Sequence, residues 1–271
     1  MIEIPGILGE IVEKRLATIE QAKKKKSLAE LRTISENSSV PLSLQRTIAS
    51  KSGISLIAEM KRSSPSAGSL DPDLDPGHRA SLYCDAGAAA ISVLTEPDYF
   101  SGSIDDLAAV SIIARSSRVP VLRKDFIVDE YQIHEARAAG ADCILLIIAC
   151  LDPKQYADLF TVSTSMGMDV IVEVFDEPEL DTALTEVDPN ILGINNRNLK
   201  TLETSLSVFE TLSKRIPEDR IRVAESGMKN STDVERMGYA GAKAVLVGES
   251  LMKAGIDVSE LAQAMAAVEI G

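Results

Sequence analysis

Short apolar runs alternate with amphipathic stretches along most of this chain of 271 residues. Eight runs of four to six residues are rich in aliphatic side chains, and turn residues follow each of them. Runs of this length and composition predict buried strands. The predicted strands are Ser55–Ala58, Ala89–Leu94, Val119–Lys124, Cys143–Ile148, Asp169–Val174, Ile191–Ile194, Ile221–Ala224 and Ala244–Val247.

Amphipathic stretches with helical spacing follow the predicted strands. They cover Gly77–Asp85, Ile104–Arg115, Glu130–Ala139, Pro153–Ser165, Glu177–Thr185, Leu206–Arg215, Thr232–Met237 and Val258–Val268. Strict alternation of strand and helix predicts a parallel sheet, because each helix serves as the crossover to the next strand. Eight evenly spaced units fit the α/β class and a closed (β/α)₈ (TIM) barrel.

A doubly wound open sheet is the structural alternative to the barrel. Such a sheet usually carries a glycine-rich turn after its first strand, where a nucleotide binds. Here the first predicted strand runs into Glu59-Met60-Lys61-Arg62, and no such turn follows. The sequence therefore favours the closed barrel.

The segment before the first strand predicts a helix with one apolar stripe, because its apolar residues recur at spacings of three and four. The stripe consists of Ile4, Leu8, Ile11, Val12, Leu16 and Ile19. We expect about residues 1–50 to form an N-terminal helical extension that packs on the barrel. No Pro/Ser-rich linker divides the units, so residues 1–271 are expected to form a single (β/α)₈ barrel domain.

The composition is that of a globular protein, with 45% hydrophobic and 25% charged residues. The formal net charge of −13 argues against nucleic acid as a partner, and an anionic substrate would need a local concentration of cations and backbone N–H groups. No apolar run reaches the roughly 18 residues that span a bilayer, and the N-terminus lacks the features of a signal peptide. We expect a cytoplasmic protein with no membrane association.

The cysteines do not suggest a metal site. Cys84, Cys143 and Cys150 are odd in number and lack CxxC spacing, and neither His78 nor His134 stands at ligand spacing from them. Buried reduced thiols and the absence of a metal centre are the expectations.

Polar residues cluster where the predicted strands end. In a parallel barrel these carboxyl ends form the mouth at which active sites lie. The residues are Glu59, Lys61, Lys124, Asp125, Glu173, Asn195, Arg197, Glu225, Ser226 and Gly248. One charged residue at a strand end is often only solvated, but several carboxylates and cations around one rim can set the pKa values of an acid and a base apart. The pattern predicts a catalytic centre at the mouth.

Two glycine turns follow the last two strands. Glu225-Ser226-Gly227 comes after the seventh strand, and Gly248-Glu249-Ser250 comes after the eighth. Barrels commonly bind phosphate between these two loops, where backbone N–H groups can approach an anion. The pair predicts a phosphorylated small-molecule substrate.

Several segments resemble those of indole-3-glycerol-phosphate synthases of the monofunctional form, in order and in spacing. They are Ile57–Ser66, Ile91–Glu96, Leu122–Val128, Val172–Val174, Gly193–Leu199 and Ala224–Gly227. The resemblance runs from about Ile4 to the C-terminus. Two positions depart from the family's pattern, since Ser63 stands where a basic residue is frequent and Phe175 where histidine is frequent, and neither is expected to do chemistry. A fused phosphoribosylanthranilate isomerase domain is not expected.

The resemblance implies a cofactor-free carboxy-lyase of tryptophan biosynthesis. Its substrate would be 1-(2-carboxyphenylamino)-1-deoxyribulose 5-phosphate, which closes a ring and loses carbon dioxide and water to give indole-3-glycerol phosphate. Lys124 is the candidate proton donor for ring closure, and we expect burial or the nearby charge of Lys61 to lower its pKa. Lys61 would also contact the substrate carboxylate, and the acid roles of the two lysines are not divided between them.

Further roles follow from the same resemblance. Glu173 would be the base for the later proton removals, oriented with the help of Glu59, Asn195 and Arg197. Phe100 and Phe126 would pack on the anthranilate ring, although either could simply fill the core. The other substrate-binding candidates are Ser64, Glu225, Ser226, Gly227, Leu246, Gly248 and Glu249. Ser226, Gly227, Gly248 and Glu249 would offer backbone N–H groups to the phosphate, with the carboxylate of Glu249 pointing away, and Ser64 and the N-terminal helix would complete the wall.

Two other functions are compatible with a barrel of this kind. A phosphoribosylanthranilate isomerase typically has a cysteine near its first strand, where this chain has Glu59 and Lys61. A catalytically silent barrel would have lost a lysine or glutamate from the rim, and all are present here. We expect a monomer or a weak homo-oligomer.

Overall fold

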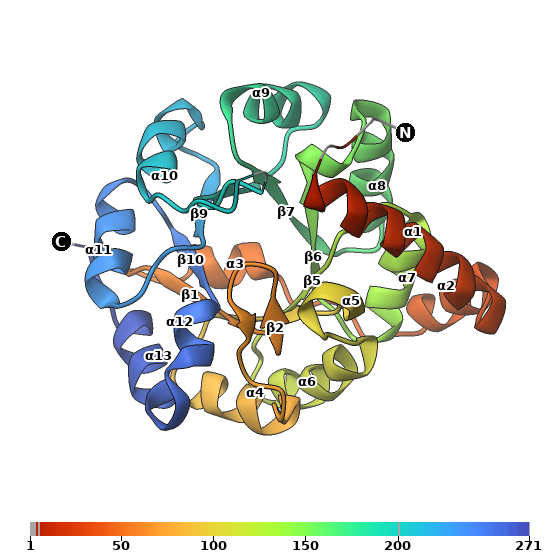
Figure 1. The fold of residues 1–271 in the computed structure, drawn as a ribbon, viewed down its shortest axis with the longest axis horizontal. Helices are drawn as coiled ribbons and strands as arrows, with labels where there is room; N and C mark the ends of the chain where they lie inside the picture. Colours follow the sequence, from red (N-terminus) through yellow and green to blue (C-terminus); the bar gives the residue numbers. More distant parts are fainter. Residues whose placement is uncertain (1–3, 5, 200, 271) are drawn as a thin grey trace.

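Eight parallel strands close into a barrel in the computed structural model, which describes residues 4, 6–199 and 201–270 (Figure 1). Around the barrel the strands follow the order β1-β10-β9-β8-β7-β6-β5-β4, so each neighbours the barrel strand next to it in the chain. They are β1 (Ser55–Met60), β4 (Ala90–Leu94), β5 (Val121–Lys124), β6 (Cys143–Ile147), β7 (Asp169–Val174), β8 (Ile191–Asn195), β9 (Ile221–Glu225) and β10 (Ala244–Val247). The predicted (β/α)₈ architecture is confirmed.

The ends of the strands differ slightly from the prediction. β5 begins at Val121 rather than Val119, and Pro120 between them has no N–H to donate to a ladder. β1, β8 and β9 run further than predicted and so take in Glu59, Asn195 and Glu225. These three polar side chains therefore project from hydrogen-bonded strands instead of from loops.

Helices surround the barrel on the outside (Figure 1). Those that follow the strands are α4 (Pro76–Asp85), α6 (Ile104–Ser116), α7 (Glu130–Ala138), α8 (Pro153–Ser165), α9 (Glu177–Glu186), α10 (Ser207–Leu212), α11 (Ser231–Tyr239) and α13 (Val258–Ala266). All eight agree with the predicted helical stretches within three residues at each end, and the stretch at 206–215 finishes as a 3₁₀ turn, η2 (Ser213–Arg215). Most begin with a side-chain cap, such as Asp152, whose carboxylate accepts from the backbone N–H of Gln155.

Several short elements were not predicted. They are α5 (Pro97–Phe100), α12 (Glu249–Lys253), the hairpin of β2 (Ser63–Ser64) and β3 (Gly68–Ser69), and the 3₁₀ turns η1 (Ile148–Cys150) and η3 (Gly255–Asp257). Each has five residues or fewer, which is too short for a hydrophobic period to appear. The hairpin, α5 and α12 follow β1, β4 and β10, so these elements shape the mouth of the barrel.

The N-terminal extension consists of three helices, α1 (Ile7–Lys25), α2 (Leu28–Glu36) and α3 (Leu44–Ala49). The predicted stripe is confirmed in α1, where Leu8, Ile11, Val12 and Ile19 are buried and Leu16 is partly buried, whereas Ile4 precedes the helix. α1 packs against α5, α7 and η1. The extension therefore reaches from the outer helices to the mouth of the barrel.

The third helix of the extension closes the opposite end of the barrel. Leu44 is completely buried, and the backbone N–H of Gln45 donates to Asp169 at the start of β7 (2.9 Å). The backbone N–H of Leu42 donates to Asp142, just before β6 (2.8 Å). With this end closed by α3, the side chains at the strand carboxyl ends face the open end.

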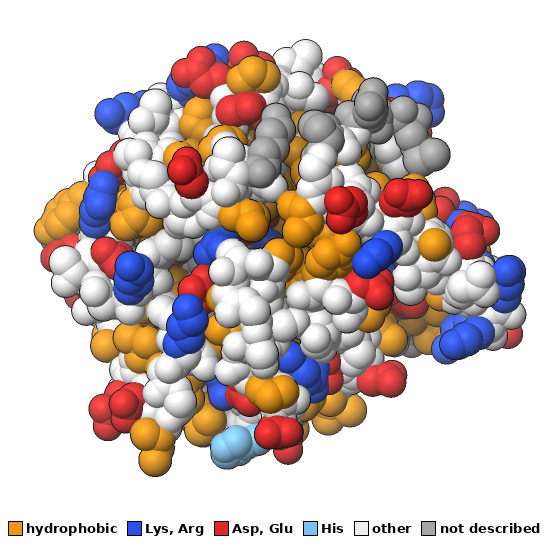
Figure 2. Space-filling model, viewed as in Figure 1, with side chains coloured by type: hydrophobic (Ala, Val, Ile, Leu, Met, Phe, Trp, Pro, Cys, Tyr) orange, Lys and Arg blue, Asp and Glu red, His pale blue; other side chains and the backbone are white. Residues whose placement is uncertain are grey.

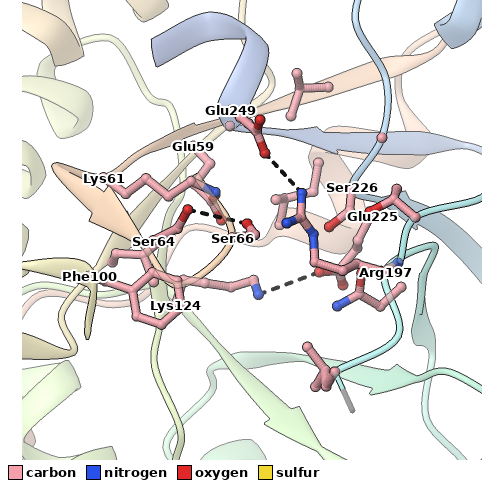
Figure 3. A pocket seen from close by; sticks show the side chains of 18 of the residues that line it. Glu59, Lys61, Ser64, Ser66, Phe100, Lys124, Arg197, Glu225, Ser226 and Glu249 are labelled. Carbon is pink, nitrogen blue, oxygen red and sulfur yellow. Dashed lines mark hydrogen bonds and ion pairs between the residues drawn. The ribbon is translucent and has the colours of Figure 1, made fainter. Parts of the chain in front are cut away.

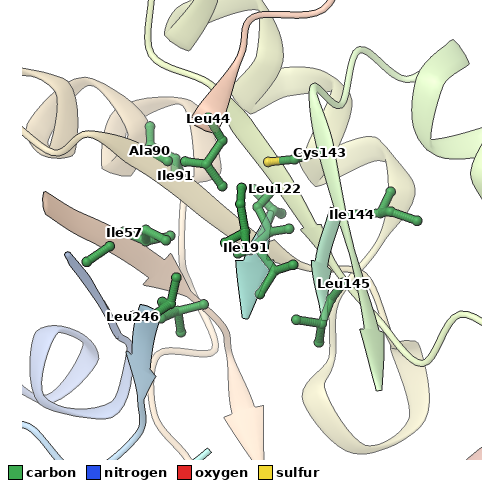
Figure 4. Close-up of a cluster of buried hydrophobic side chains, with 14 of the residues drawn as sticks. Leu44, Ile57, Ala90, Ile91, Leu122, Cys143, Ile144, Leu145, Ile191 and Leu246 are labelled. Atoms are coloured by element: carbon green, nitrogen blue, oxygen red, sulfur yellow. The ribbon is translucent and has the colours of Figure 1, made fainter. Parts of the chain in front are cut away.

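Aliphatic side chains fill the barrel (Figure 4). Leu44, Ile57, Leu122 and Ile191 are among those with almost no exposed surface. Cys143 and Cys150 are buried as predicted, and burial raises the pKa of both thiols. The prediction was wrong for Cys84, which is partly exposed because it lies on the outer helix α4. Among the described residues, no helix is both long and apolar enough to cross a membrane.

Candidate active site

A cavity of about 770 Å³ opens at the carboxyl ends of the strands. Figure 2 shows hydrophobic side chains together with Lys and Arg side chains near the centre of this face. All fifteen site residues expected from the sequence line the cavity, and Figure 3 shows many of them pointing toward one another. They are Glu59, Lys61, Ser64, Phe100, Lys124, Phe126, Glu173, Asn195, Arg197, Glu225, Ser226, Gly227, Leu246, Gly248 and Glu249. Ser63 and Phe175, where the sequence departs from the family's pattern, are not among the lining residues.

Lys124 lies among carboxylates at the end of β5. Its Nζ is 3.2 Å from Oε2 of Glu173 and 3.7 Å from Oε2 of Glu225. Figure 3 shows Lys124 pointing toward Glu225. Burial disfavours the charged amine, but the carboxylates of Glu173, Glu225 and Glu59 outweigh this effect and raise the pKa of Lys124. The expectation of a lowered pKa was therefore wrong, and the lysine is charged at neutral pH.

Lys61 does not supply the neighbouring positive charge that was expected to act on Lys124. Its Nζ is 2.5 Å from Oε1 of Glu59, so the two residues form a close ion pair at the end of β1. Both side chains are largely buried, with 14% of Lys61 and 5% of Glu59 exposed. Lys61 and Lys124 are thus each paired with a carboxylate, Lys61 with Glu59 and Lys124 with Glu173.

Glu173 has a defined orientation because both of its oxygens are bonded. Oε2 accepts from Lys124, and Oε1 accepts from Nδ2 of Asn195 (3.1 Å). Oδ1 of Asn195 accepts in turn from the backbone N–H of Arg197 (3.0 Å). A carboxylate held in this way, beside a charged lysine, is suited to accept a proton at a fixed position.

Glu225 is buried in the cavity without a hydrogen-bond partner among the described residues. It is 1% exposed, and neither of its carboxyl oxygens accepts a hydrogen bond from the described residues. Burial and the neighbouring charge of Glu173 raise the pKa of Glu225 well above its usual range, although Lys124 opposes the shift. Glu225 therefore keeps its proton to a higher pH than a free glutamate, and in the protonated form it can donate a hydrogen bond.

The raised pKa of Glu225 predicts a pH-dependent loss of stability. In the unfolded chain this glutamate ionises near its usual 4.5, whereas the folded protein holds the proton at higher pH. The folded state then binds more protons, so stability falls as the pH rises above about 4.5 toward the folded pKa. Glu225→Gln removes this pH-dependent contribution to stability. The unfolding midpoint of the variant minus that of the unmodified protein should therefore be larger at pH 8 than at pH 5. Circular dichroism melts at both pH values test this, and an offset that does not change with pH would contradict the raised pKa of Glu225.

The side chain of Glu249 points toward the cavity, contrary to expectation. Its Oε2 accepts from Nη2 of Arg197 (2.9 Å), and its Oε1 accepts from Nζ of Lys253 one turn further along α12 (2.6 Å). Figure 3 shows the contact with Arg197 above the mouth. The prediction failed because it considered only the backbone of residue 249 and not the two cations beside it.

The two glycine turns occupy the expected side of the cavity. Ser226 and Gly227 both have positive φ values, of 66° and 90°. A Cβ at Gly227 would lie 2.9 Å from Thr204 and 3.1 Å from Leu206, so a larger residue there would strain the fold as well as the loop. The backbone N–H of Ser226 is not free for an anion, since it donates to the carbonyl of Leu246 (3.4 Å).

Aromatic and aliphatic side chains form the opposite wall. The rings of Phe100 and Phe126 lie 6.0 Å apart and are inclined by 40°. From the extension, Ile7, Leu8 and Ile11 line the same cavity. This wall offers an apolar surface for a flat ring, and the other wall offers charges and backbone amides.

Sequence reasoning missed part of the lining. The additional residues include Leu145, Ile147, Leu199, Leu202, Thr204, Leu206, Lys229, Asp233, Lys253 and Leu261. The apolar stripe of α1 was a usable signal for Leu8 and Ile11. Leu202, Thr204 and Leu206, in the loop after β8, belong to no motif from which their place over the cavity could be inferred.

Solved structures with a similar architecture support the fold. A thiamine phosphate pyrophosphorylase from Pyrococcus furiosus matches with a TM-score of 0.61 at 14% identity, covering 82% of this chain and 96% of that one. A structure titled "Native KDPGal structure" matches with a TM-score of 0.57 at 18% identity, covering 78% of this chain and 91% of that one. At these identities the likeness concerns the fold alone.

Sequence relatives are much closer. Indole-3-glycerol phosphate synthase from Rhodospirillum rubrum is 45% identical over 252 residues, covering 91% of this chain and 94% of that protein. Those from Polaromonas sp. and Mycolicibacterium gilvum are 45% and 43% identical, each over 94% of its own length. The family model described as "Indole-3-glycerol phosphate synthase" matches residues 8–265. The chain therefore belongs to the indole-3-glycerol phosphate synthase family.

Proposed function

We propose that this chain is a carboxy-lyase of tryptophan biosynthesis. It converts 1-(2-carboxyphenylamino)-1-deoxyribulose 5-phosphate to indole-3-glycerol phosphate, carbon dioxide and water. The observation that carries the proposal is the position of Lys124, whose Nζ lies 3.2 Å from Glu173 in a cavity that also presents Phe100 and Phe126. This arrangement offers an acid, a base and an apolar wall within one site.

Ring closure needs a proton donor at the ketone oxygen of the substrate. The ring carbon that carries the carboxylate attacks the ketone, a new carbon–carbon bond forms, and the oxygen becomes an alkoxide. An alkoxide is far more basic than an amine, because hydroxyl groups of this kind have pKa values of roughly 15. Lys124 can therefore protonate it even with the raised pKa that its carboxylate neighbours cause.

Decarboxylation and dehydration complete the reaction. The carboxyl group leaves as carbon dioxide, and its bonding electrons restore the aromatic ring. The new hydroxyl then leaves as water after it gains a proton, and a base removes a proton from the neighbouring carbon to form the pyrrole double bond. Glu173, held by Lys124 and Asn195, is the base in this proposal, and Lys61 beside Glu59 is an acid within the same cavity. Lys61 also contacts the substrate carboxylate.

The proposed orientation places the aromatic ring of the substrate against Phe100 and Phe126 and its phosphate near the two glycine turns. Ser64 and Leu246 belong to the walls between them. Arg197 and Lys253 supply local positive charge in a protein whose net charge is −13. Local cations and backbone amides can bind a phosphate dianion despite the repulsion from the net negative charge of the protein.

The remaining parts of the proposal concern the whole protein. The chain acts without a metal or an organic cofactor in this proposal, since the steps change no redox state and Lys124, Glu173 and Lys61 supply the acid and base groups. It acts as a single barrel domain, residues 1–271, in the cytoplasm, as a monomer or a weak homo-oligomer. Neither nucleic acid nor a membrane is a partner.

A side chain at Gly248 should impair catalysis, because Glu59 and Lys61 lie directly beside this glycine. A Cβ at this position would overlap Oε1 of Glu59 and lie 3.0 Å from Nζ of Lys61. Gly248→Ala should therefore push the ion pair apart and lower kcat/KM by about 10-fold to 100-fold, as small misplacements of catalytic groups do. Steady-state kinetics and the inhibition constant of inorganic phosphate measure the effect. Gly77→Ala, at a position where a Cβ would have room, is the matched control, and equal kinetics for the two variants would contradict the account.

The proposed activity is tested by indole fluorescence. The chain contains no tryptophan, so the indole product appears against a low background. Purified protein given the carboxyphenylamino substrate should produce this signal, and protein given phosphoribosylanthranilate should not isomerise it. Isomerisation without indole formation would favour the other phosphate-binding barrel, and neither reaction would favour a silent one.

A further inference from the structure

A buried charge cluster lies directly behind Lys124. Asp125 follows this lysine in the chain and is 1% exposed. Its Oδ2 accepts from Arg15 (2.8 Å) and Arg123 (3.0 Å) as well as from the hydroxyl of Thr95, while its Oδ1 accepts from the backbone N–H of Phe126 (2.8 Å). Asp125 also lines the cavity. The residue therefore fixes the chain between the proposed acid and the proposed ring-binding phenylalanine.

Arg15 comes from the N-terminal extension, on helix α1, 110 positions before its partner. Only 5% of its side chain is exposed. It stands one helical turn beyond Ile11, on the face of α1 that also carries Leu8, and both of these residues line the cavity. One face of α1 thus provides both a wall of the site and a cation beneath it.

The cluster is electrically balanced. The positive charges of Arg15 and Arg123 face the negative charges of Asp125 and Glu135, whose Oε2 accepts from Arg123 (2.8 Å). Burial opposes the ionisation of Asp125, but the two arginines outweigh it and lower the pKa of its carboxyl group. Without Arg15 the cluster would hold one uncompensated negative charge next to Lys124. Because an unpaired buried charge is destabilising, the side chains around Asp125 would be expected to rearrange.

We infer that Arg15 is a positioning residue for the reaction, which acts through Asp125 to fix Lys124 and Phe126 and holds α1 over the cavity. The inference rests on the proposed function, since it gives Arg15 a part in the chemistry assigned to Lys124. The alternative is that Arg15 only attaches the extension to the barrel.

Other contacts of the extension make the two possibilities separable. Lys23, also on α1, pairs with Asp129 at 2.8 Å, and the hydroxyl of Tyr131 donates to the carbonyl of Lys26 (3.0 Å). These contacts attach the extension to α7 without touching Asp125. Lys23→Met is therefore a matched control, because it removes a cation of the same helix whose partner lies four residues after Asp125.

The experiment compares the unmodified chain with Arg15→Met, Arg15→Lys and Lys23→Met. Kinetics by indole fluorescence, well below each unfolding midpoint, should show kcat/KM lowered about 10-fold to 100-fold in Arg15→Met, with kcat itself reduced. Arg15→Lys should recover part of the loss, and Lys23→Met should stay within about twofold of the unmodified chain. Hydrogen exchange in peptides that cover residues 121–131 should accelerate in Arg15→Met around the backbone N–H of Phe126.

Two results would overturn the inference. One is a folded Arg15→Met protein with the kinetic constants of the unmodified chain, and the other is an equal loss in Lys23→Met, which would mean that any loosening of α1 suffices. If Arg15→Met does not fold, Thr95→Val removes another donor to Asp125 without touching α1, and unchanged kinetics there would be equally contrary. Absence of product from the unmodified chain would refute the proposed function instead, while hydrogen exchange would still report on the role of Arg15 in fixing Phe126.

Discussion

Lys124→Met should lower kcat by at least about 100-fold, because general acid catalysis by a positioned group contributes roughly 10²-fold to 10⁴-fold. Methionine preserves much of the unbranched side chain of lysine and removes only the donor and its charge. Glu173 then loses the charged partner whose Nζ lies 3.2 Å from its Oε2. The variant should lose both the acid of the proposed mechanism and one of the two contacts that orient its base.

Binding measurements separate this loss from a loss of folding. The product should bind Lys124→Met with nearly unchanged affinity, since the phenylalanine wall and the glycine turns are not altered. Lys154→Met is a suitable control, because Lys154 lies on the exposed face of α8, where it pairs with Asp158. Turnover of Lys124→Met within about tenfold of the control would show that another group supplies the proton.

Glu173→Gln should stall the reaction after decarboxylation. Glutamine has nearly the shape of glutamate and can still accept from Asn195, but it cannot take a proton at neutral pH. Indole formation should fall at least about 100-fold, and in a single turnover the release of carbon dioxide should run ahead of the indole signal. Stopped-flow fluorescence combined with a carbon dioxide assay measures both.

The control for this variant is Glu210→Gln, which removes a carboxylate from a surface pair with Arg236 and should leave both signals unchanged. Equal slowing of carbon dioxide release and indole formation in Glu173→Gln would assign Glu173 to an earlier step. In that case Lys61 and Glu59 would become the groups to examine for the later steps.

The barrel could be predicted from the sequence because each strand and helix shows its own hydrophobic period within a short segment of the chain. Strand runs of Val, Ile and Leu and the helices between them have different periods, and their alternation leaves few topologies. The same local pattern predicted which residues stand at the strand ends, so Glu59, Lys124, Glu173 and Asn195 were expected to lie together at the mouth of the barrel. Short elements such as α5 and α12 escaped, since four or five residues do not display a period.

Contacts between side chains from distant parts of the chain could not be predicted. The direction of the pKa shift of Lys124 depends on three carboxylates from three other strands, whereas the sequence-based expectation considered only burial and the charge of Lys61. Glu249 turns toward Arg197, 52 positions away, and Asp125 receives Arg15 from 110 positions away. No pattern within either segment encodes its partner.

The most direct test of the account is the complete reaction catalysed by metal-free protein. The chain, dialysed against EDTA and supplied with carboxyl-labelled 1-(2-carboxyphenylamino)-1-deoxyribulose 5-phosphate, should release one labelled carbon dioxide for each indole-3-glycerol phosphate formed, with no added cofactor. Lys124→Met and Glu173→Gln, measured alongside, show whether the barrel mouth performs the conversion. Release of carbon dioxide without indole by the unmodified chain, no product at all, or product only after a metal is restored would contradict the account.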